Sequence, residues 1–459
     1  MILACAVLAG CATYQPKPIT PTQLANSFEE RSLTSGNLKT WLAQQLGQEI
    51  EPWPLPRWNS EMLTLAAYYY SPALDIARAQ WGTAKAGTEV AGAIPNPVLH
   101  LPFEYTRPNP GPGRPYTTGP ALDIPIETAH KRGYRIDQAS HLSEAARLNI
   151  GNEAWKVRGQ LRDALLSLYA EGEQVSFLTQ KVAAQQQILK MVTKRRAVGE
   201  AAGPDVNLAV LVLTQAQAEL AAAQSGLLDA RARVASVIGL PIRAVESVQL
   251  DLDEFAQTGA APPPAEARRA ALFHRADLLG SLAEYDAAQA GLQLEIAKQY
   301  PDIHLGPGYT YDTGTNRFGF GLSGITLPIF DRNEGGIAQA EAKRKEAAAR
   351  AAALQDAIIN DLDHALAHYQ TSLDALRLST LHLSTAQKQM SSQAASFTAG
   401  TTDRLSLAQA NADYQMSTID HLNAVVKAQQ AVGALEDSMQ RPLSPMVLDG
   451  TMTEAEIPR

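Results

Sequence analysis

Cysteine is almost absent from this chain, and aromatic residues are scarce. The two cysteines, Cys5 and Cys11, both lie at the N-terminus, so the rest of the sequence has no thiol and no disulfide framework. Phe, Trp and Tyr make up 6% of the 459 residues, whereas hydrophobic residues make up 45%. Small apolar side chains therefore dominate, and this composition favours long packed helices over a thick aromatic core.

An excess of basic charge is also missing. The formal net charge is −8 and the pI is about 5.7, which excludes the concentrated basic surface of a nucleic-acid-binding protein. We find no Gly-rich phosphate loop, nucleophile elbow or cysteine cluster, so we predict no catalytic residue, no cofactor and no enzyme. Beyond residue 11 no apolar run reaches about 18 residues, and no membrane-spanning helix is expected.

One histidine pair raises the question of a metal site. His364 and His368 are four residues apart, and Asp361 precedes them on the same helix face. Two imidazoles at that spacing can hold a divalent ion. No general-base glutamate lies between them and no third histidine follows nearby, and a solvated or lumen-facing polar stripe explains them equally well. We therefore predict no metal site.

The N-terminal run "MILACAVLAGC" ends in Leu8-Ala9-Gly10-Cys11, which resembles the lipobox of bacterial lipoproteins. We predict that Cys11 is lipidated and, because Ala12 follows it in place of aspartate, that the protein is delivered to the outer membrane. The positively charged start of a secretory signal is missing. The alternative is a frayed apolar start with an incidental thiol.

The rest of the chain divides into two similar halves. Aligning His100 with His304, a shift of 204 residues, also pairs Leu101 with Leu305 and Tyr105 with Tyr309. The shift becomes 203 where Ile124-Pro125-Ile126 matches Leu327-Pro328-Ile329. We expect an extended, proline-rich segment over 12–60, a first repeat over 61–257, a linker over 258–269, a second repeat over 270–440 and a tail over 441–459.

Each half contains a segment in which apolar residues alternate with polar or small ones, at about 97–126 and 301–329. A period of two predicts strands with one apolar face. The phase slips by one at Gly324, which predicts a bulge or bend. Each run is about ten residues long, which suits a tilted strand that crosses a bilayer. The predicted lipid-facing residues are Leu99, Leu101, Phe103, Tyr105, Phe318, Phe320 and Leu322.

Four strands do not close a barrel. In lipid each unpaired backbone amide costs several kcal/mol, so only closed barrels persist there. We therefore expect the strands to be completed by identical chains, and a homotrimer supplies twelve. The alternative, two β-hairpins on a soluble helical protein, is disfavoured because isolated hairpins are marginal in water.

The segments between the strand islands have heptad spacing. In the first half an apolar row interleaves with an alanine row, which predicts close left-handed helix packing. The second half repeats one row, but Gln415 and Gln429 interrupt the other, which suits a seam facing water or another subunit. Residues 131–198 lack proline and allow a rod of about 100 Å. A soluble coiled-coil scaffold has the same periodicity. The rows are Val206, Leu213, Leu220, Leu227 and Val234; Ala209, Ala216, Ala223, Ala230 and Val237; and Leu405, Ala412, Ile419 and Val426.

A family resemblance covers roughly residues 60–440. The duplicated order of helix, strand pair and helical hairpin resembles the outer-membrane efflux protein family, the TolC-like channels. So do "YPDIHLGPGYTY", "LPIFDRNEGGIAQAEAKRKEA", the tips "AVGEAAGPDV" and "FTAGTTDRL", and "AVGALEDSMQRP". The stretch "LDIPIETAHKRGYRIDQA" most resembles the channels of heavy-metal and related tripartite pumps.

The resemblance implies a lipid-anchored homotrimer with a 12-stranded barrel in the outer membrane and a helical tunnel in the periplasm. A periplasmic adaptor would dock at the helix tips. An inner-membrane RND-type pump, or an ABC transporter, would supply energy for exporting heavy-metal cations or drugs through a passive duct. A type I protein-secretion duct has the same features and remains an alternative, as does a soluble coiled-coil scaffold.

At the tips, Gly199 and Gly400 lie where each helix pair must reverse, which favours positive φ, and Asp205 and Asp403 lie where N-cap carboxylates bind free amides. The resemblance also places Asp205 on the carboxylate of a gate lock. The tyrosine and arginine of that lock are replaced by Phe397 and Thr402, and Arg404 lies close enough in sequence to substitute. The acidic residues of the family's constriction are replaced by Ser406 and Gln409, so no electronegative constriction is expected there. The expected adaptor-docking residues are Val198, Gly199, Glu200, Ala399, Gly400 and Thr401.

Overall fold

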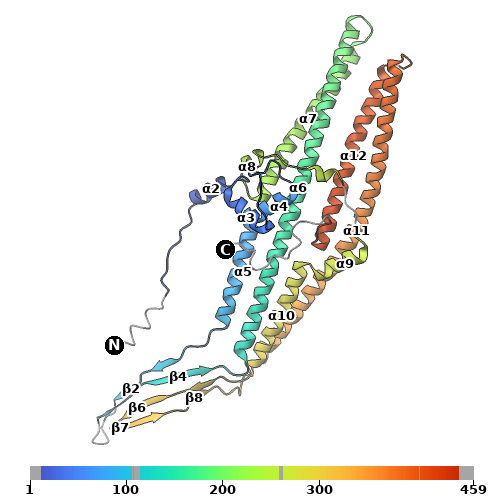
Figure 1. Ribbon diagram of the computed structural model, residues 1–459. Helices are drawn as coiled ribbons and strands as arrows, with labels where there is room; N and C mark the ends of the chain where they lie inside the picture. The colour runs from blue at the N-terminus through green and yellow to red at the C-terminus, as the bar shows by residue number, and fades with distance from the viewer. Residues whose placement is uncertain (1–11, 106, 108–113, 258–261, 403, 444–459) are drawn as a thin grey trace. The chain divides into compact units, whose positions relative to one another are not determined.

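The computed structural model describes residues 12–105, 107, 114–257, 262–402 and 404–443 (Figure 1). Cys11 and Asp403 lie outside these residues, as does most of the C-terminal tail. The chain forms two compact units, Met1–Tyr70 with Ser167–Leu252, and Ser71–Leu166 with Asp253–Arg459. The helix α6, Lys131–Ala197, runs from the second unit into the first. The predicted combination of long helices with short strands is confirmed.

In its described residues the first unit contains helices, loops and one isolated β-bridge, between Trp58 and Leu250, but no strand. Residues 12–60, expected to be extended, contain two helices, so that prediction is wrong there. Proline does not prevent them, because Pro21 occupies the first turn of its helix and Thr20 caps it. The next helix buries Leu38 and Leu42 on one face. The helices wholly inside this unit are α2 (Pro21–Glu29), α3 (Gly36–Leu46), α4 (Ser60–Tyr70), α7 (Gly203–Ile238) and α8 (Ile242–Glu246).

The predicted alanine seam of α7 is confirmed. Its d-type alanines are buried, and the interleaved leucines are half-buried. Lys181 of α6 bonds Glu219 of α7 with its Nζ 2.7 Å from Oε2, and this bond holds the pKa of Glu219 below its ordinary value. Small side chains at one row therefore allow the two helices to pack closely, as in a coiled coil.

By length and composition, α7 is the one helix of the described part that meets the criterion for crossing a membrane, where the sequence analysis expected none. Its alanine row is nevertheless packed inside the unit, and polar residues recur on the rest of its surface, including Thr214, Gln215 and Gln217. A single such helix is weak evidence of a membrane span, and we assign α7 to the helical hairpin.

The second unit holds the remaining helices around an apolar core. Tyr369, Ile358 and Leu362 of α11 are each 1% exposed and pack with Leu435 of α12 and alanines of α9. The helix α9 begins inside the predicted linker, of which residues 258–261 are not described. The elements are α5 (Pro72–Ala91), the 3-10 helix η1 (Asp253–Ala256), α9 (Pro264–Phe273), α10 (Ala276–Ala297), α11 (Glu334–Thr398) and α12 (Arg404–Met439).

The predicted seam of α12 is confirmed only in part. Ile419 and Val426 are half-buried, but Ala412 is exposed, and Ala410 and Ser417, which lie outside both predicted rows, are buried. Gln429, expected to face water or another subunit, is 3% exposed. Its side-chain amide donates to the carbonyls of Phe255 and Gln257 at 3.1 and 2.7 Å, and its Oε1 accepts from Arg162 at 2.8 Å. Full hydrogen bonding explains how an amide is accommodated in the interior.

Beside Gln429, a buried carboxylate joins α6 to α12. Glu436 is 4% exposed, and its Oε2 lies 2.9 Å from Arg158 and 3.6 Å from Arg162. Burial lowers the pKa of Arg162 and raises that of Asp437, which accepts from Trp155 at 2.8 Å. Buried charges of opposite sign therefore compensate one another between α6 and α12.

We expect Glu436→Gln to destabilise the protein by about 3–5 kcal/mol, because it leaves two buried guanidinium groups without their counter-charge. The matched control is Glu266→Gln, whose partner Arg441 lies 3.2 Å away and whose side chain, like that of Arg441, is more than half exposed. That change should cost less than about 1 kcal/mol. Thermal unfolding of the two purified variants measures the difference, and equal midpoints would contradict the assignment.

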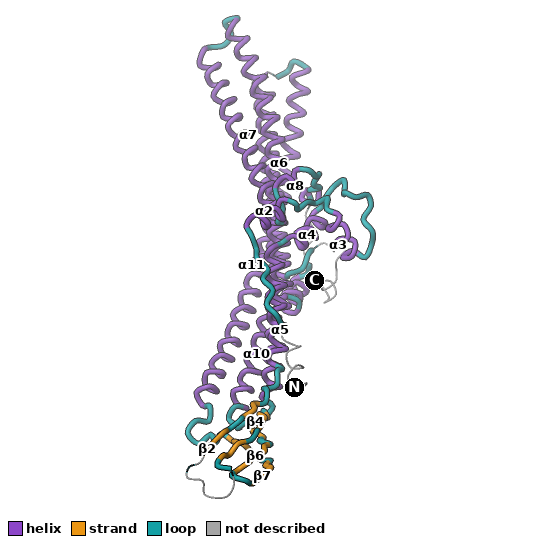
Figure 2. Tube along the Cα trace, turned by 90° about the vertical axis from the view of Figure 1, so that its left-hand side faces the viewer, coloured by secondary structure: helices purple, strands orange, loops and turns teal. Residues whose placement is uncertain are grey.

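The strands gather at one end of the helices (Figure 2). Each of the four predicted strands is present but interrupted, three of them at a proline that has no amide to donate: Pro102, Pro120 and Pro307. The pieces are β1 (Val98–His100), β2 (Phe103–Tyr105), β3 (Tyr116–Thr118), β4 (Ala121–Ile126), β5 (Ile303–Leu305), β6 (Gly308–Asp312), β7 (Thr315–Gly319) and β8 (Leu322–Ile325).

Taken as four broken strands, the sheet is an antiparallel meander. The β1–β2 strand pairs with β3–β4, β3–β4 with β5–β6, and β5–β6 with β7–β8. The two repeats therefore meet at the centre of the sheet. The register shifts between His304 and Leu305 where they pair with Gly324 and Leu322, so the predicted bulge is confirmed.

Candidate functional site

One face of the sheet is apolar and aromatic. The register pairs Phe103 with Thr118, Thr118 with Tyr311, and Tyr309 with Phe318, which puts these residues on the same side. Ring centroids lie 5.2 Å apart for Tyr116 and Tyr311, and 5.1 Å apart for Tyr309 and Phe318. Aromatic rings on all four strands therefore lie on this face, and they contact one another across neighbouring strands.

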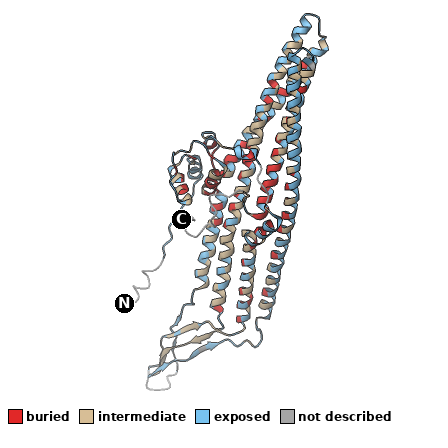
Figure 3. Cartoon of the chain, turned by 45° about the vertical axis from the view of Figure 1, so that its right-hand side comes forward, coloured by how far each residue is buried: buried red, intermediate tan, exposed pale blue. Residues whose placement is uncertain are grey.

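No described strand residue is buried in a single chain (Figure 3), and much of this face is exposed. Phe318 is 85% exposed and Phe320 is 77% exposed, far more than a water-soluble surface favours for such large side chains. The other predicted lipid-facing residues, Leu99, Leu101, Phe103, Tyr105 and Leu322, are also exposed. The face needs a covering of apolar character.

The opposite face is polar and carries bonds between the two repeats. Thr117 donates to Asp312 at 3.0 Å, and Nδ1 of His304 lies 3.1 Å from the Asp123 carboxylate. Arg317 pairs with Asp312 at 3.3 Å. The sequence analysis used His304 only to align the repeats and missed Asp123, although polar residues at every second position were the signal for this face.

A network of hydrogen bonds around Asp302 joins the sheet to the helices. Nζ of Lys131, at the start of α6, lies 2.7 Å from Asp302 Oδ1 and 2.6 Å from the Tyr300 carbonyl, and the Thr128 amide donates to the same carboxylate at 3.0 Å. Burial alone would raise the pKa of the Asp302 carboxyl. The bonds from Lys131 and Thr128 lower this pKa by more than burial raises it, so it lies below its ordinary value. This carboxylate therefore holds the chain between β4 and α6 against the chain that enters β5.

The two outer strands have one free edge each. Within the described residues, β1–β2 pairs only with β3–β4, and β7–β8 pairs only with β5–β6. Their outward backbone amides and carbonyls lack strand partners there, and such edges bind further strands readily.

The two helix tips turn in the same way. Gly199 has φ +82° and Gly400 has φ +72°, so the predicted left-handed turns are confirmed. The Glu200 amide donates to the Arg195 carbonyl at 2.9 Å, and the Thr401 amide donates to the Ser396 carbonyl at 3.0 Å. Both are Schellman caps, which satisfy the last carbonyls of a helix. The remaining docking residues predicted at the tips, Val198 and Ala399, are exposed as well.

The predicted gate residues are placed as follows. Asp205 does not occupy the N-cap itself but the third position of α7, where its Oδ2 accepts from the Ala202 amide at 2.8 Å. Asp205 belongs to the first unit and Phe397 to the second, so the lock stays a prediction. Of the others, Arg404 and Gln409 are exposed, and Thr402 and Ser406 are half-buried.

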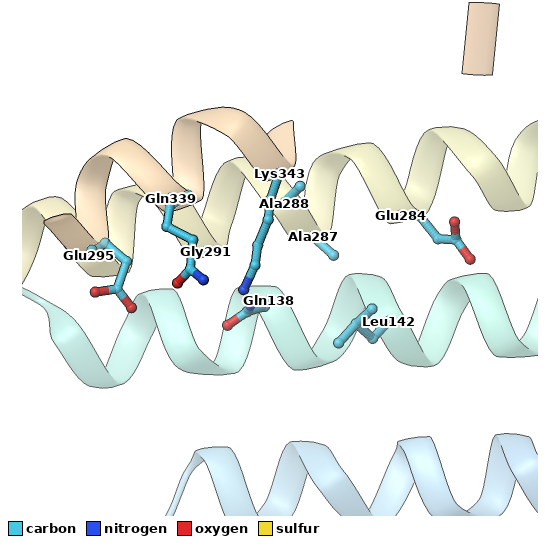
Figure 4. Close-up of a pocket in the computed structure, with 11 residues that line it drawn as sticks. Gln138, Leu142, Glu284, Ala287, Ala288, Gly291, Glu295, Gln339 and Lys343 are labelled. Carbon is cyan, nitrogen blue, oxygen red and sulfur yellow. The ribbon is translucent and has the colours of Figure 1, made fainter. Parts of the chain in front are cut away.

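A hollow of about 260 Å³ lies between α6, α10 and α11 (Figure 4). Gly291 and Gly336 make room for it, and Glu284, Glu295 and Lys343 line it. The Glu295 carboxylate is already bonded to Lys298 at 2.6 Å and Asn333 at 2.8 Å. No residue predicted from sequence lies there, and we assign the hollow no ligand.

His364 and His368 are exposed on α11, with their ring centroids 5.5 Å apart. Among the described residues no group of three His, Cys, Asp or Glu side chains is arranged to hold a metal ion.

Comparison with known proteins gives a family match in two blocks. The family model described as "Outer membrane efflux protein" matches residues 67–240 and 267–439. One relative, the cobalt-zinc-cadmium resistance protein CzcC of Cupriavidus metallidurans, is 28% identical over 266 residues. That alignment covers 58% of this chain and 61% of the relative.

Solved structures share the fold. The outer membrane protein VceC of Vibrio cholerae superposes with a TM-score of 0.69 at 18% identity, covering 84% of this chain and 97% of that one. The open state of the MtrE outer membrane channel of Neisseria gonorrhoeae gives a TM-score of 0.68 at 16% identity, covering 84% and 90%.

Proposed function

Since this chain belongs to the outer membrane efflux protein family, we propose that three copies form the outer-membrane channel of a tripartite efflux system. The observation that carries the proposal is the four-stranded meander with two free edges and one exposed aromatic face. In lipid such a sheet is stable only when closed, because no water is available to the free amides and carbonyls. Three copies supply twelve strands.

Closure of the barrel assigns a role to each face of the sheet. The aromatic face would contact lipid, where burial of Phe103, Phe318 and Phe320 is favourable. The polar face, with Asp123, His304 and Asp312 bonded among themselves and their neighbours, would line a water-filled lumen. The chain would act as a passive duct, anchored additionally by a lipid at Cys11.

The cargo and partners follow from the same proposal. A periplasmic adaptor would dock at the exposed tips around Gly199 and Gly400, and an inner-membrane pump would drive transport. The name of the relative CzcC favours divalent heavy-metal cations as cargo over drugs, and favours efflux over protein secretion. The channel would not select the cation at its tip, because Ser406 and Gln409 carry no charge.

We expect removal of the gene from its host to lower the tolerated concentration of Zn²⁺, Co²⁺ and Cd²⁺, and the full-length chain to restore it. Minimal inhibitory concentrations measure this directly. Drug sensitivity without metal sensitivity would contradict the cargo, and restoration of protein secretion alone would contradict the efflux role.

The tips can be tested in the same strain. Gly400→Val forces a β-branched residue into a positive φ, whereas asparagine at this position tolerates a positive φ. We therefore expect Gly400→Asn to restore metal tolerance and Gly400→Val to restore it poorly. Nothing lies within 4 Å of a Cβ built at this position, so a difference between the variants in restored metal tolerance would reflect the backbone turn. Equal restoration by both variants would argue against docking through this turn.

A further inference from the structure

On one side of the bulge beside Gly324, the two repeats have equivalent strand pairs. In the first repeat Leu99 pairs with Leu122 and His100 with Ala121. In the second repeat Ile303 pairs with Ile325 and His304 with Gly324. A shift of 204 residues on the first strand and 203 on the second converts one set of pairs into the other. The sheet therefore repeats its own geometry up to the bulge beside Gly324.

The equivalence fails in two places. Beyond the bulge, β6 pairs with β7 one residue out of step with the pairing of β2 with β3. The second place is the free edge of the β7–β8 strand. In the first repeat β4 continues to Ile126 because it pairs with β5, with Ile124 opposite Leu305 and Ile126 opposite Ile303. In the second repeat β8 stops at Ile325. The equivalents of Ile124 and Ile126, which are Leu327 and Ile329, are each 67% exposed.

The side of Gly324 is vacant in the same way. Its equivalent in the first repeat, Ala121, pairs with Gly308, and a Cβ built on Gly308 would lie 3.2 Å from the Ala121 Cβ. A Cβ built on Gly324 would meet nothing within 4 Å. The strand β8 thus ends early because it lacks the neighbouring strand that its equivalent, β4, has in β5 and β6.

We propose that the missing neighbour is the β1–β2 strand of a second copy, in the register that already joins β4 to β5 and β6 within one chain. This inference rests on the proposed trimeric barrel and specifies its interface. Applying the two shifts to the observed pairs places Gly324 opposite Glu104, Leu327 opposite Leu101, Pro328 opposite His100 and Ile329 opposite Leu99 of the neighbouring copy.

The chemistry of the paired residues agrees with this register. Leu99, Leu101, Leu327 and Ile329 would all lie on the apolar face, so the exposed aliphatic side chains of one edge cover those of the other. A slip of one residue would put apolar side chains on the polar face. A slip of two keeps the faces but loses the continuity between the two kinds of interface, so it is the alternative that an experiment must exclude.

The register can be measured by cysteine cross-linking. The Leu122 amide donates to the Pro307 carbonyl and the Tyr309 amide to the Pro120 carbonyl, both at 2.9 Å, so the Ala121–Gly308 pair between them is not hydrogen-bonded. Such pairs have the closest Cα atoms, about 4.5 Å apart, which suits a disulfide. By equivalence, the three inter-chain pairs of this kind are His100 with Pro328, Pro102 with Thr326, and Glu104 with Gly324.

We expect mild oxidation to link chains into dimers and trimers when cysteines replace the matched residues, as in Glu104→Cys with Gly324→Cys, Pro102→Cys with Thr326→Cys, and His100→Cys with Pro328→Cys. Mismatched combinations offset by two residues, such as Pro102→Cys with Gly324→Cys, should link at least about tenfold less. Ala121→Cys with Gly308→Cys is the control, because its disulfide forms within one chain and yields no ladder on a non-reducing gel.

Each double variant is also treated with a lysine-reactive cross-linker, which shows whether it forms a trimer independently of the introduced cysteines. Trimers that link through the offset pairs, or trimers that link through none of the three matched pairs, would overturn the register while leaving the barrel intact. Absence of any trimer from the wild-type chain would instead contradict the proposed function on which the register rests.

Discussion

Deletion of residues 301–328 should abolish outer-membrane insertion and export together. The deletion removes β5 to β8 and with them every partner of β4 except β1. The two strands that remain form a hairpin with its apolar face uncovered, and such hairpins are marginal on their own. Three copies would supply six strands, fewer than the eight of small closed membrane barrels. Membrane fractionation and metal tolerance of the same cells measure both losses.

A second deletion, outside the strands, serves as the control for export of a shortened polypeptide. Residues 13–19 are exposed and form no helix or strand, so their removal should leave insertion and export near the wild-type level. Wild-type export by the 301–328 deletion would refute the role of the strands. Loss of export with normal insertion would show that the strands act in transport alone.

A single charge on the apolar face is expected to have the second-largest effect. Phe103 and Glu104 are neighbours in β2 and point to opposite faces of the sheet, and both are exposed in the single chain. Phe103→Arg would place a guanidinium in lipid, at a cost of about 2–4 kcal/mol near the bilayer midplane. Glu104→Arg places the same group toward the lumen, where water solvates it.

The amount of heat-modifiable trimer in the outer membrane measures this difference. We expect Phe103→Arg to reduce it strongly and Glu104→Arg to leave it close to the wild-type level. If both faces of the sheet lay in water, each arginine would be solvated, and the two substitutions would have the same small effect on the amount of trimer. Equal trimer levels for the two variants would therefore contradict the assignment of the faces.

Much of the sheet and the tips could be predicted from the sequence, because local patterns determine them. Alternation of apolar and polar residues predicts which face Phe103 and Phe318 occupy, and the slip of phase at Gly324 predicts the bulge. The positive φ of Gly199 and Gly400 follows from a residue without a Cβ between two helices.

The parts that were missed depend on contacts between distant residues. Gln429 resembles a surface residue until its side chain bonds Arg162 and the carbonyls of Phe255 and Gln257. Glu436 is charged and still buried because Arg158 approaches from a helix 278 residues away in sequence. Proline content predicts an extended segment over residues 12–60, although Pro21 starts a helix and α3 contains no proline. Spacing along the chain does not reveal such partners.

The central claim is that these strands are completed only by other copies of the same chain in a membrane. Its most direct test is the mass of the full-length protein extracted from the outer membrane in mild detergent, determined together with its heat-modifiable mobility. The account predicts a particle of three chains whose sheet is lost on heating and which precipitates when detergent is removed. A stable single chain in detergent-free buffer, with its strands intact, would contradict it.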